Sequence, residues 1–410
     1  MRHYNNHQTA SSQPYAHYKT CQSPVVHKSS RQSTASMRRL NVCENHDMKT
    51  PGSYPITRRA WMAGTAAMAF SAAAETVRLP RKIKVAILGF DGHTGEIIDP
   101  LPQLPDVEIT AICDPDPAVC TRAKRNPKLA SARQYTDYEK MLGGEELDVV
   151  AVCNTNGERA RAILACANRK LNVIAEKPLA IERQDLDRIR ETVARNKIGL
   201  SMLLPMRFSP PYLALKQVVD SGEIGEVAQM GAQKSYKLGD RPAWMRKRES
   251  YGGTIPYIGI HMVDLMRWGS GREFTEVFSY QTRIGFPELG DMENVTGSLF
   301  RLDNGGIAVL RMDYLRPETA PTHGDDRLRI VGTKGVVEYQ LATGVTVLSD
   351  RRKPEVIEKL PAGGSVFVDF LESVYNGKSP RLPLADIYRV NEIVLVARQA
   401  GEQHRPLPIL

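Results

Sequence analysis

Short apolar runs, each bounded by a turn, alternate with helical stretches along the first half of the chain. β-branched residues dominate the runs, as expected of strands that are buried on both faces of a sheet. The runs occupy residues 82–89, 107–113, 148–153 and 172–175, and the clearest helical stretch occupies residues 159–168. This alternation predicts an α/β fold whose doubly wound parallel sheet is joined by right-handed crossovers.

The chain before the first predicted strand has a different composition. Residues 1–57 are rich in Ser, Gln, His and Asn without a hydrophobic period, which predicts a disordered tail. The pair Arg58–Arg59 and the uncharged small residues 63–74 resemble a twin-arginine signal peptide, so we expect export of the folded protein to the periplasm. The alternative is a chance arginine pair before an alanine-rich helix.

The apolar part of this signal is too short to remain as a permanent membrane span, which needs about 20 apolar residues. It also lies far from Met1, whereas Met48 would place it at the usual distance from a start. We therefore expect translation to begin at Met48, and a start at Met1 stays the alternative. Residues 1–79 are assigned to the tail and signal.

The formal net charge of +9 is concentrated in this tail. Residues 1–79 hold ten basic and three acidic residues, a net of +7, and the rest of the chain holds 45 basic and 43 acidic residues, a net of +2. A nearly neutral body offers no electrostatic footprint for a phosphate backbone, which excludes nucleic acid as a partner. The body's four cysteines form no CxxC pair, so we expect buried thiols and no metal site.

The turn after the first strand has the composition of a dinucleotide-binding loop. Gly89, Gly92 and Gly95, with Phe90 between the first two, allow a diphosphate to approach the backbone near a helix start. The spacing departs from G-x-G-x-x-G, because Asp91 occupies the second glycine position and brings negative charge to an anion site.

A carboxylate at the end of the second strand supports the same interpretation. Asp114 lies 25 residues after Gly89, where an acidic residue accepts hydrogen bonds from ribose hydroxyls and repels a 2′-phosphate. NAD is therefore expected rather than NADP. The alternative is that Asp114 is an ordinary Asp-Pro turn residue.

Two later segments carry a family resemblance. Glu176-Lys177-Pro178 follows the fourth strand, and a Gly-Gly lead at residues 252–253 is followed by Gly-x-His-x-x-Asp at residues 259–264. In this order after such a fold, they resemble the glucose–fructose oxidoreductase, inositol dehydrogenase and rhizopine-catabolism (Gfo/Idh/MocA) family over residues 82–400.

The resemblance implies an NAD(P)-binding Rossmann domain at 80–203 and a C-terminal α/β domain at 204–410. The second domain has an open, mostly antiparallel sheet that commonly packs against a partner subunit, so a homo-oligomer is expected. Strand-like runs fit this sheet, and a closing helix is expected at about 384–398. The runs occupy residues 227–236, 276–283, 293–301, 306–315, 327–331 and 336–340.

The resemblance also assigns site residues. Asn154, Asn156, Glu176 and Lys177 follow the third and fourth strands, at the sheet edge where such folds bind their cofactor. Hydride transfer from a carbinol carbon needs a base, for which His261 is suited, and a group such as Lys177 to orient the hydroxyl with a lowered pKa.

Three further residues are expected to bind substrate. Arg207 follows the crossover into the second domain, Trp244 could stack on a sugar ring, and Asp264 could hold a sugar hydroxyl. Arg207 and Trp244 could equally be a surface residue and a core residue, and Asp264 could instead hold its helix.

The chain departs from the family pattern at three positions. Asp91 is the first, and Arg159 stands where a histidine is usual, after Asn154-Thr155-Asn156 in place of Thr-Pro-Asn. Tyr257 replaces an aspartate, so it is expected to bond substrate or His261, or else to pack as an aromatic.

The sequence thus predicts an NAD(P)-dependent oxidoreductase acting on a sugar, polyol or sugar derivative. Two alternatives stay open. One is a glycosidase that uses retained NAD for transient oxidation and elimination. The other is a non-catalytic sugar-binding relative.

Overall fold

The computed structural model describes residues 76–410. The expected disordered tail, the arginine pair and the rest of the export signal up to residue 75 lie outside the described residues. No helix within residues 76–410 is both long and apolar enough to cross a bilayer.

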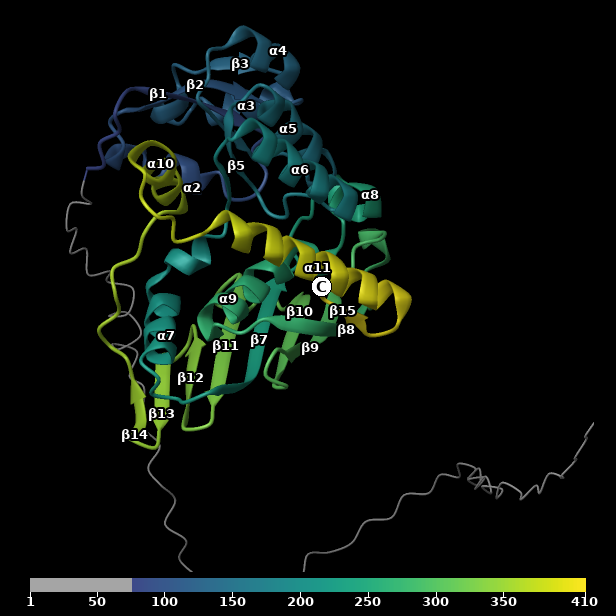
Figure 1. Ribbon diagram of the computed structural model, residues 1–410. Coiled ribbons are helices and arrows are strands. Elements are labelled where there is room, and N and C mark those ends of the chain that lie inside the picture. Colours follow the sequence, from purple (N-terminus) through teal and green to yellow (C-terminus); the bar gives the residue numbers. More distant parts are fainter. Residues whose placement is uncertain (1–75) are drawn as a thin grey trace, which may run out of the picture. The chain divides into compact units, whose positions relative to one another are not determined.

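Six parallel strands form the first sheet, in the order β3-β2-β1-β4-β5-β6 (Figure 1). The strands are β1 (Ile83–Leu88), β2 (Val107–Cys113), β3 (Arg133–Tyr135), β4 (Val149–Val152), β5 (Asn172–Ala175) and β6 (Leu200–Met202). The predicted doubly wound parallel sheet is confirmed. The strand order reverses between β1 and β4, so the loops that follow these strands diverge and leave a crevice at their carboxyl ends.

Five helices connect these strands: α2 (Gly95–Ile98), α3 (Pro117–Ala123), α4 (Tyr138–Gly144), α5 (Asn156–Asn168) and α6 (Arg183–Asn196). The helix after the glycine loop, α2, is a single turn. Pro100 and Pro102 follow it closely and cannot donate the backbone hydrogen bonds that would continue it. A diphosphate near this loop would therefore meet individual backbone N–H groups more than a long helix dipole.

Nine strands form the second sheet, in the order β14-β13-β12-β11-β7-β10-β9-β8-β15. They are β7 (Val227–Lys237), β8 (Phe274–Thr282), β9 (Val295–Leu302), β10 (Ile307–Arg316), β11 (Gly324–Gly332), β12 (Gly335–Gln340), β13 (Gly344–Ser349), β14 (Arg352–Val356) and β15 (Leu407–Pro408). Only β7 and β10 pair in parallel, so the expected open, mostly antiparallel sheet is confirmed.

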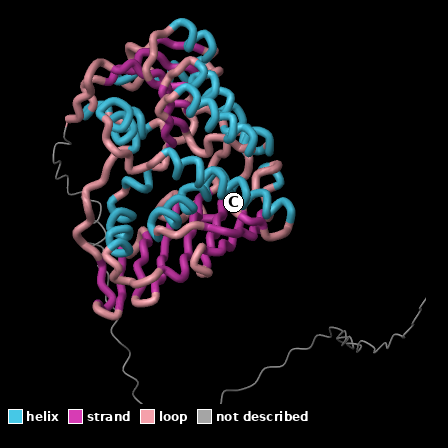
Figure 2. The backbone as a smooth tube through the Cα atoms, viewed as in Figure 1, coloured by secondary structure: helices cyan, strands magenta, loops and turns pink. Residues whose placement is uncertain are grey.

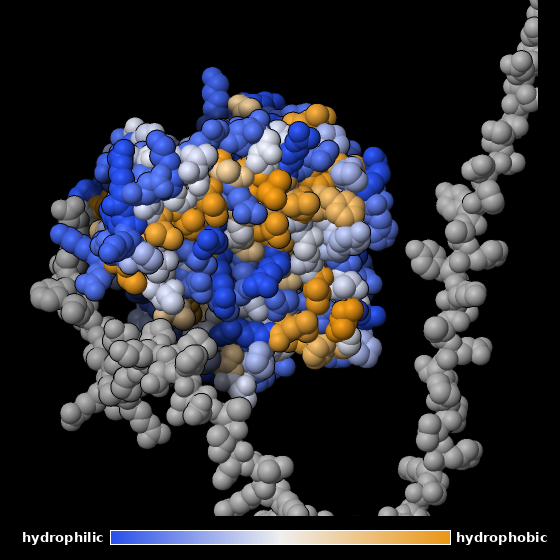
Figure 3. Space-filling model, turned by 90° about the horizontal axis from the view of Figure 1, so that it is seen from below, coloured by the Kyte–Doolittle hydropathy of each residue, from blue (hydrophilic) through white to orange (hydrophobic). Residues whose placement is uncertain are grey.

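Helices cover one face of this second sheet (Figures 1 and 2). The helices of this part are α7 (Pro210–Asp220), α8 (Arg248–Tyr251), α9 (Ile260–Ser270), α10 (Val366–Asn376) and α11 (Leu384–Gln403), and α7, α9 and α11 contact the strands directly. In β10 the side chains alternate: Leu310 and Met312 are buried under the helices, whereas Ile307 and Val309 are exposed. Figure 3 shows the molecule from below, with several groups of apolar side chains among the polar ones.

The last helix joins the two sheets. The Oδ1 atom of Asn391 in α11 accepts a hydrogen bond from the Leu179 N–H at 2.9 Å. Arg398, in the same helix, donates to the carbonyls of Ile181 at 2.6 Å and Gly252 at 3.1 Å. Because these partners flank the Glu176–Pro178 segment and the start of the Gly-Gly lead, α11 fixes both motifs relative to one another.

Candidate active site

A cavity of about 440 Å³ opens at the carboxyl ends of β1, β2 and β4. Gly89 lies on its wall with φ +81°, and a Cβ there would come within 2.6 Å of the Asn154 backbone. Only glycine combines this left-handed conformation with so close an approach. Asn154 supplies a buried Oδ1 that has no partner among the described residues, so an acceptor is free for a bound ligand.

Acidic residues dominate the polar lining of this cavity. Asp91, Asp114, Asp116, Asp137 and Glu158 line it, and Lys, Arg and His do not occur among its lining residues within 76–410. Burial raises the pKa of Asp114, and the Asp116 N–H donates to Asp114 Oδ1 at 3.0 Å. This lining suits the hydroxyls of an adenosine ribose and disfavours a 2′-phosphate. The cavity therefore fits NAD.

The glycine loop is anchored by Glu176. The carboxylate of Glu176 accepts hydrogen bonds from the His93 N–H, from His93 Nδ1 at 2.8 Å and from the Lys177 N–H at 3.0 Å. Gly92, with φ +77°, packs directly on this carboxylate. Burial alone would raise the pKa of Glu176, but His93, Lys177 and Arg159 outweigh it and lower the pKa to about 2. Glu176 therefore shapes the cofactor loop from behind.

The two unusual charges of the nucleotide-binding part compensate one another. Asp91 is largely buried, which raises its pKa, and the charge of Arg159 acts in the opposite direction. Arg159 is itself buried and donates to Asn156 Oδ1 at 2.9 Å, to the Pro178 carbonyl at 2.8 Å and to the Asn154 carbonyl. The two departures from the family pattern, Asp91 and Arg159, thus carry opposite charges that stabilise one another.

Three expected cofactor residues occupy structural positions. Asn156 is predicted to bind the cofactor. Its amide instead donates to the Tyr251 carbonyl at 2.8 Å and accepts from Arg159, so both ends are engaged within the protein. Gly95 begins α2, and Phe90 packs against the core as a half-buried side chain.

A second cavity, of about 240 Å³, brings the predicted catalytic residues together. Lys177, Tyr257 and His261 line it beside the glycine loop. The lining residues are Gly92, His93, Lys177, Tyr236, Arg241, Tyr257, Ile258, His261, Tyr314 and His323. The cavity therefore joins the nucleotide-binding loop to the second sheet.

Lys177 is held at the centre of this cluster. Its Nζ donates to the Tyr257 carbonyl at 2.9 Å and lies 3.6 Å from the centre of the Tyr257 ring. Burial lowers the pKa of Lys177 to about 7, with help from Arg159, Lys234 and Arg241 and against the attraction of Glu176. An amine with this pKa takes up and releases a proton near neutral pH.

His261 lies in the first turn of α9 and is almost fully buried. Burial, together with the charges of Lys234, Lys177 and His93, holds its pKa well below the usual value, so the imidazole is neutral at pH 7. Nδ1 is buried without a partner among the described residues. The His93 ring lies 5.4 Å away, centre to centre.

Tyr257 lies in a π-helical segment, Ile255–Gly259, directly before α9. Such segments are rare and frequent at functional sites. Burial raises the pKa of Tyr257 to about 12, so its hydroxyl stays protonated. No hydrogen bond joins Tyr257 to His261 within the described chain. Tyr257 lines the cavity and its ring packs edge to face on those of Trp244 and Tyr251, so aromatic packing is observed and a hydrogen bond to substrate stays a prediction.

The structure does not place Arg207 and Asp264 in this cavity, which corrects the expectation that they bind substrate. Arg207 is fully buried and donates to both oxygens of Asp264, with Nε–Oδ2 at 2.8 Å and Nη2–Oδ1 at 2.6 Å. Its Nη1 donates to Asp386 at 2.8 Å. A buried arginine with two carboxylate partners holds α9 and α11 together.

Trp244 packs beside the cavity and not along its wall. Its ring centre lies 6.0 Å from that of Tyr257, edge to face, and 6.2 Å from that of Tyr251. The expected stacking of Trp244 on a sugar ring is therefore not prepared in this structure.

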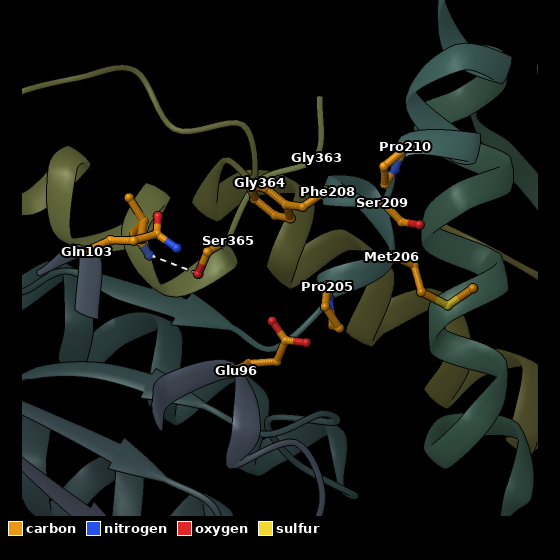
Figure 4. Close-up of a pocket in the computed structure, with 11 residues that line it drawn as sticks. Glu96, Gln103, Pro205, Met206, Phe208, Ser209, Pro210, Gly363, Gly364 and Ser365 are labelled. Carbon is orange, nitrogen blue, oxygen red and sulfur yellow. Dashed lines mark hydrogen bonds between the residues drawn. The ribbon is translucent and has the colours of Figure 1, made fainter. Parts of the chain in front are cut away.

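A third cavity, of about 600 Å³, lies between α2, the segment after β6 and the start of α10 (Figure 4). The Glu96 side chain points into it, and the Ser365 hydroxyl caps α10 by accepting from the Val368 N–H at 3.4 Å. None of the predicted site residues lines this space.

Sequence reasoning missed the residues that complete the 240 Å³ cavity. His93 carried a signal, because it stands inside the glycine loop. Tyr236, Arg241, Tyr314 and His323 come from strands and loops of the second sheet, where no local motif marks them.

Comparisons with known proteins agree with this architecture. Residues 83–203 match the model of the oxidoreductase family with an NAD-binding Rossmann fold, and residues 212–338 match the GFO/IDH/MocA C-terminal domain. A solved structure from Thermotoga maritima, designated a presumed oxidoreductase, is 31% identical, with a TM-score of 0.76 over 80% of this chain and 100% of that one.

More distant similarities extend to proteins of named activity. Myo-inositol 2-dehydrogenase of Thermotoga maritima is 26% identical over 62% of this chain and 74% of its own length. A levoglucosan dehydrogenase solved with NADH and levoglucosan is 18% identical, and with a TM-score of 0.69 over 80% of this chain and all of that one it shares the fold. The chain therefore belongs to the Gfo/Idh/MocA family of NAD-binding oxidoreductases.

Proposed function

We propose that the protein transfers a hydride between NAD and the carbinol carbon of a sugar, polyol or sugar derivative. One observation carries this proposal: the 240 Å³ cavity places Lys177 and His261 beside the nucleotide-binding loop. The inositol and levoglucosan specificities of the related dehydrogenases support a polyhydroxylated substrate.

NAD, when bound, supplies the nicotinamide ring that accepts the hydride. As the carbinol carbon loses its hydride, its hydroxyl proton passes to the neutral amine of Lys177, and the carbon becomes a carbonyl. The sequence predicts His261 as the base; we assign that role to Lys177, because its pKa of about 7 suits the proton transfer, whereas burial holds the pKa of His261 well below its usual value. In this assignment neutral His261 orients the same hydroxyl.

The test uses the purified full chain. Bound NAD is measured by absorbance and mass spectrometry, and a panel of sugars and polyols is then added while reduced nicotinamide is followed. Net reduction supports the proposal. Cleavage of aryl glycosides without net reduction would support the glycosidase alternative instead, and a chain without affinity for NAD or NADP would refute both.

We propose further that the protein forms a homo-oligomer through the open face of its second sheet. Phe278, Leu299 and Val309 lie side by side across β8, β9 and β10 on that face, with Tyr280 and Ile307 next to them. Leu299 and Val309 are 47% and 43% exposed, and neighbouring exposed apolar residues of this kind favour a protein–protein contact. Light scattering compares the molar mass of Val309→Glu with that of the parent chain, and we expect the variant to be smaller. If the parent is a multimer and the variant has the same mass, this surface is not the interface.

We also propose that the protein reaches the periplasm by the twin-arginine route. The supporting feature is the Arg58–Arg59 pair before residues 63–74. Replacing both arginines by lysine should retain the precursor in the cytoplasm. Export that continues unchanged would refute the route, and N-terminal sequencing of the precursor distinguishes Met1 from Met48.

A further inference from the structure

The cavity that holds Lys177 and His261 has a second, cationic end. Arg241, from the loop after β7, and His323, before β11, face it from the second sheet. His323 stacks on Tyr236 with ring centres 5.1 Å apart and an interplanar angle of 27°. No Asp or Glu occurs among the ten residues that line the cavity.

Arg241 is held firmly and yet has no acidic partner. Its guanidinium lies 4.5 Å from the centre of the Tyr314 ring, and Nη2 donates to the Lys237 carbonyl at 2.8 Å. Nε is buried without a partner, and within residues 76–410 Arg241 forms no ion pair. Four of its five N–H donors are thus unused by the protein, an unusual condition for a partly buried arginine.

The acidic groups near this end are already committed. Two of them come from the second sheet and its loops: Asp326 accepts from the buried Lys234 at 2.7 Å, and Glu318 lies 4.0 Å from Lys237. Glu176, behind the glycine loop, is bonded to His93. The charge of Arg241 therefore remains uncompensated, and it contributes to the lowered pKa values of Lys177 and His323.

We propose that Arg241 binds a carboxylate of the substrate, so that the enzyme acts on a sugar acid in preference to a neutral sugar or polyol. Planar guanidinium groups recognise carboxylates well, and Tyr314 fixes the plane of this one. The cavity, at about 240 Å³, is smaller than the range of about 300–1,000 Å³ typical of drug-sized ligands, which suits a single monosaccharide unit. This inference rests on the proposed dehydrogenase function.

The test measures the turnover of matched substrates by the NAD-loaded full chain. Glucuronate is compared with glucose and gluconate with glucitol, and glucose 6-phosphate tests whether a phosphate is preferred to a carboxylate. We expect kcat/KM for at least one acid to exceed that of its neutral partner by about 10- to 100-fold, the usual worth of a hydrogen bond to a charged group. Equal values, or a preference for the phosphate, would overturn the proposal.

Two variants locate the effect. Arg241→Gln should lower kcat/KM for the acid by about 10- to 100-fold more than it lowers kcat/KM for the neutral sugar, mainly through KM, while Arg241→Lys should recover part of this difference. Arg246→Gln is the matched control, because Arg246 is exposed on the next turn and does not line the cavity. An equal loss on both substrates would show a structural role and refute the assignment.

Calorimetry with the sugar acid gives a readout independent of turnover. The inference is supported if the sugar acid binds the NADH-loaded parent chain and Arg241→Gln weakens this binding. Absence of binding overturns it. If neutral polyols are oxidised and acids are not preferred, the substrate class fails while the dehydrogenase function stands. If NAD does not bind at all, the proposed function itself fails.

Discussion

Lys177→Met should abolish turnover and at the same time make the protein more stable. The ordinary pKa of a lysine is 10.5, and burial lowers that of Lys177 to about 7. Each pH unit of this difference corresponds to about 1.4 kcal/mol, so the burial of the charged amine costs up to about 5 kcal/mol. Methionine has a similar stem without the charge. Loss of the hydrogen bond to the Tyr257 carbonyl costs the variant about 1 kcal/mol. The expected net gain in the free energy of unfolding is therefore about 2–4 kcal/mol.

The stability difference between Lys177→Met and the parent protein should depend on pH. Between about pH 7 and 10.5 the unfolded chain carries a proton on Lys177 that the folded chain lacks, so the stability of the parent protein rises with pH across this window. The electrostatic advantage of Lys177→Met is therefore largest at or below pH 7. It falls to about 2 kcal/mol at pH 9, a value from which the cost of the lost hydrogen bond is still to be subtracted, and it vanishes near pH 10.5.

Urea midpoints at pH 6, 7.5 and 9 measure the effect, with Lys359→Met as control because Lys359 is exposed in the loop before α10. NAD affinity should be retained while turnover is lost. A variant that is less stable than the parent at pH 6, or a difference that does not change with pH, would refute the electrostatic reasoning.

Three further outcomes are expected. Arg207→Met should cost about 3–5 kcal/mol in urea unfolding because it leaves the buried Asp264 carboxylate unpaired, and adding Asp264→Leu should recover part of this cost; a neutral single variant would contradict the buried ion pair. Gly89→Ala should lower both stability and NAD affinity measured by calorimetry, whereas Gly143→Ala, at an open helical position in α4, should lower neither. Asp114→Ser should reduce the ratio of NAD to NADP affinity at least tenfold; an unchanged ratio would remove Asp114 from cofactor selection.

Two strands of the parallel sheet were predicted best. The runs at 107–113 and 172–175 coincide with β2 and β5 to the residue. Strands of three residues, such as β3 and β6, contain too few positions for a pattern, and they form because longer neighbours offer them hydrogen-bond partners. Local sequence does not contain that information.

The same limit applies to the site. Lys177 and His261 could be found because each lies in a short motif tied to a strand end or a helix start. Arg241 has no motif, and its place in the cavity depends on how the second sheet packs against the first. Arg207 was misjudged for a related reason: its partner Asp264 is 57 residues away, so a buried ion pair and a ligand-binding arginine have the same local sequence.

Helix α11 has a consequence for biosynthesis. The ribosome produces it about 200 residues after the Glu176–Pro178 segment, yet it supplies the partners of Leu179 and Ile181, just beyond Lys177. A nascent chain that ends before this helix can already possess a complete parallel sheet with its nucleotide crevice, but its reaction centre lacks the contacts that hold it in place. Catalytic competence is therefore acquired only after α11 has been synthesised, and truncation before this helix should uncouple cofactor retention from chemistry.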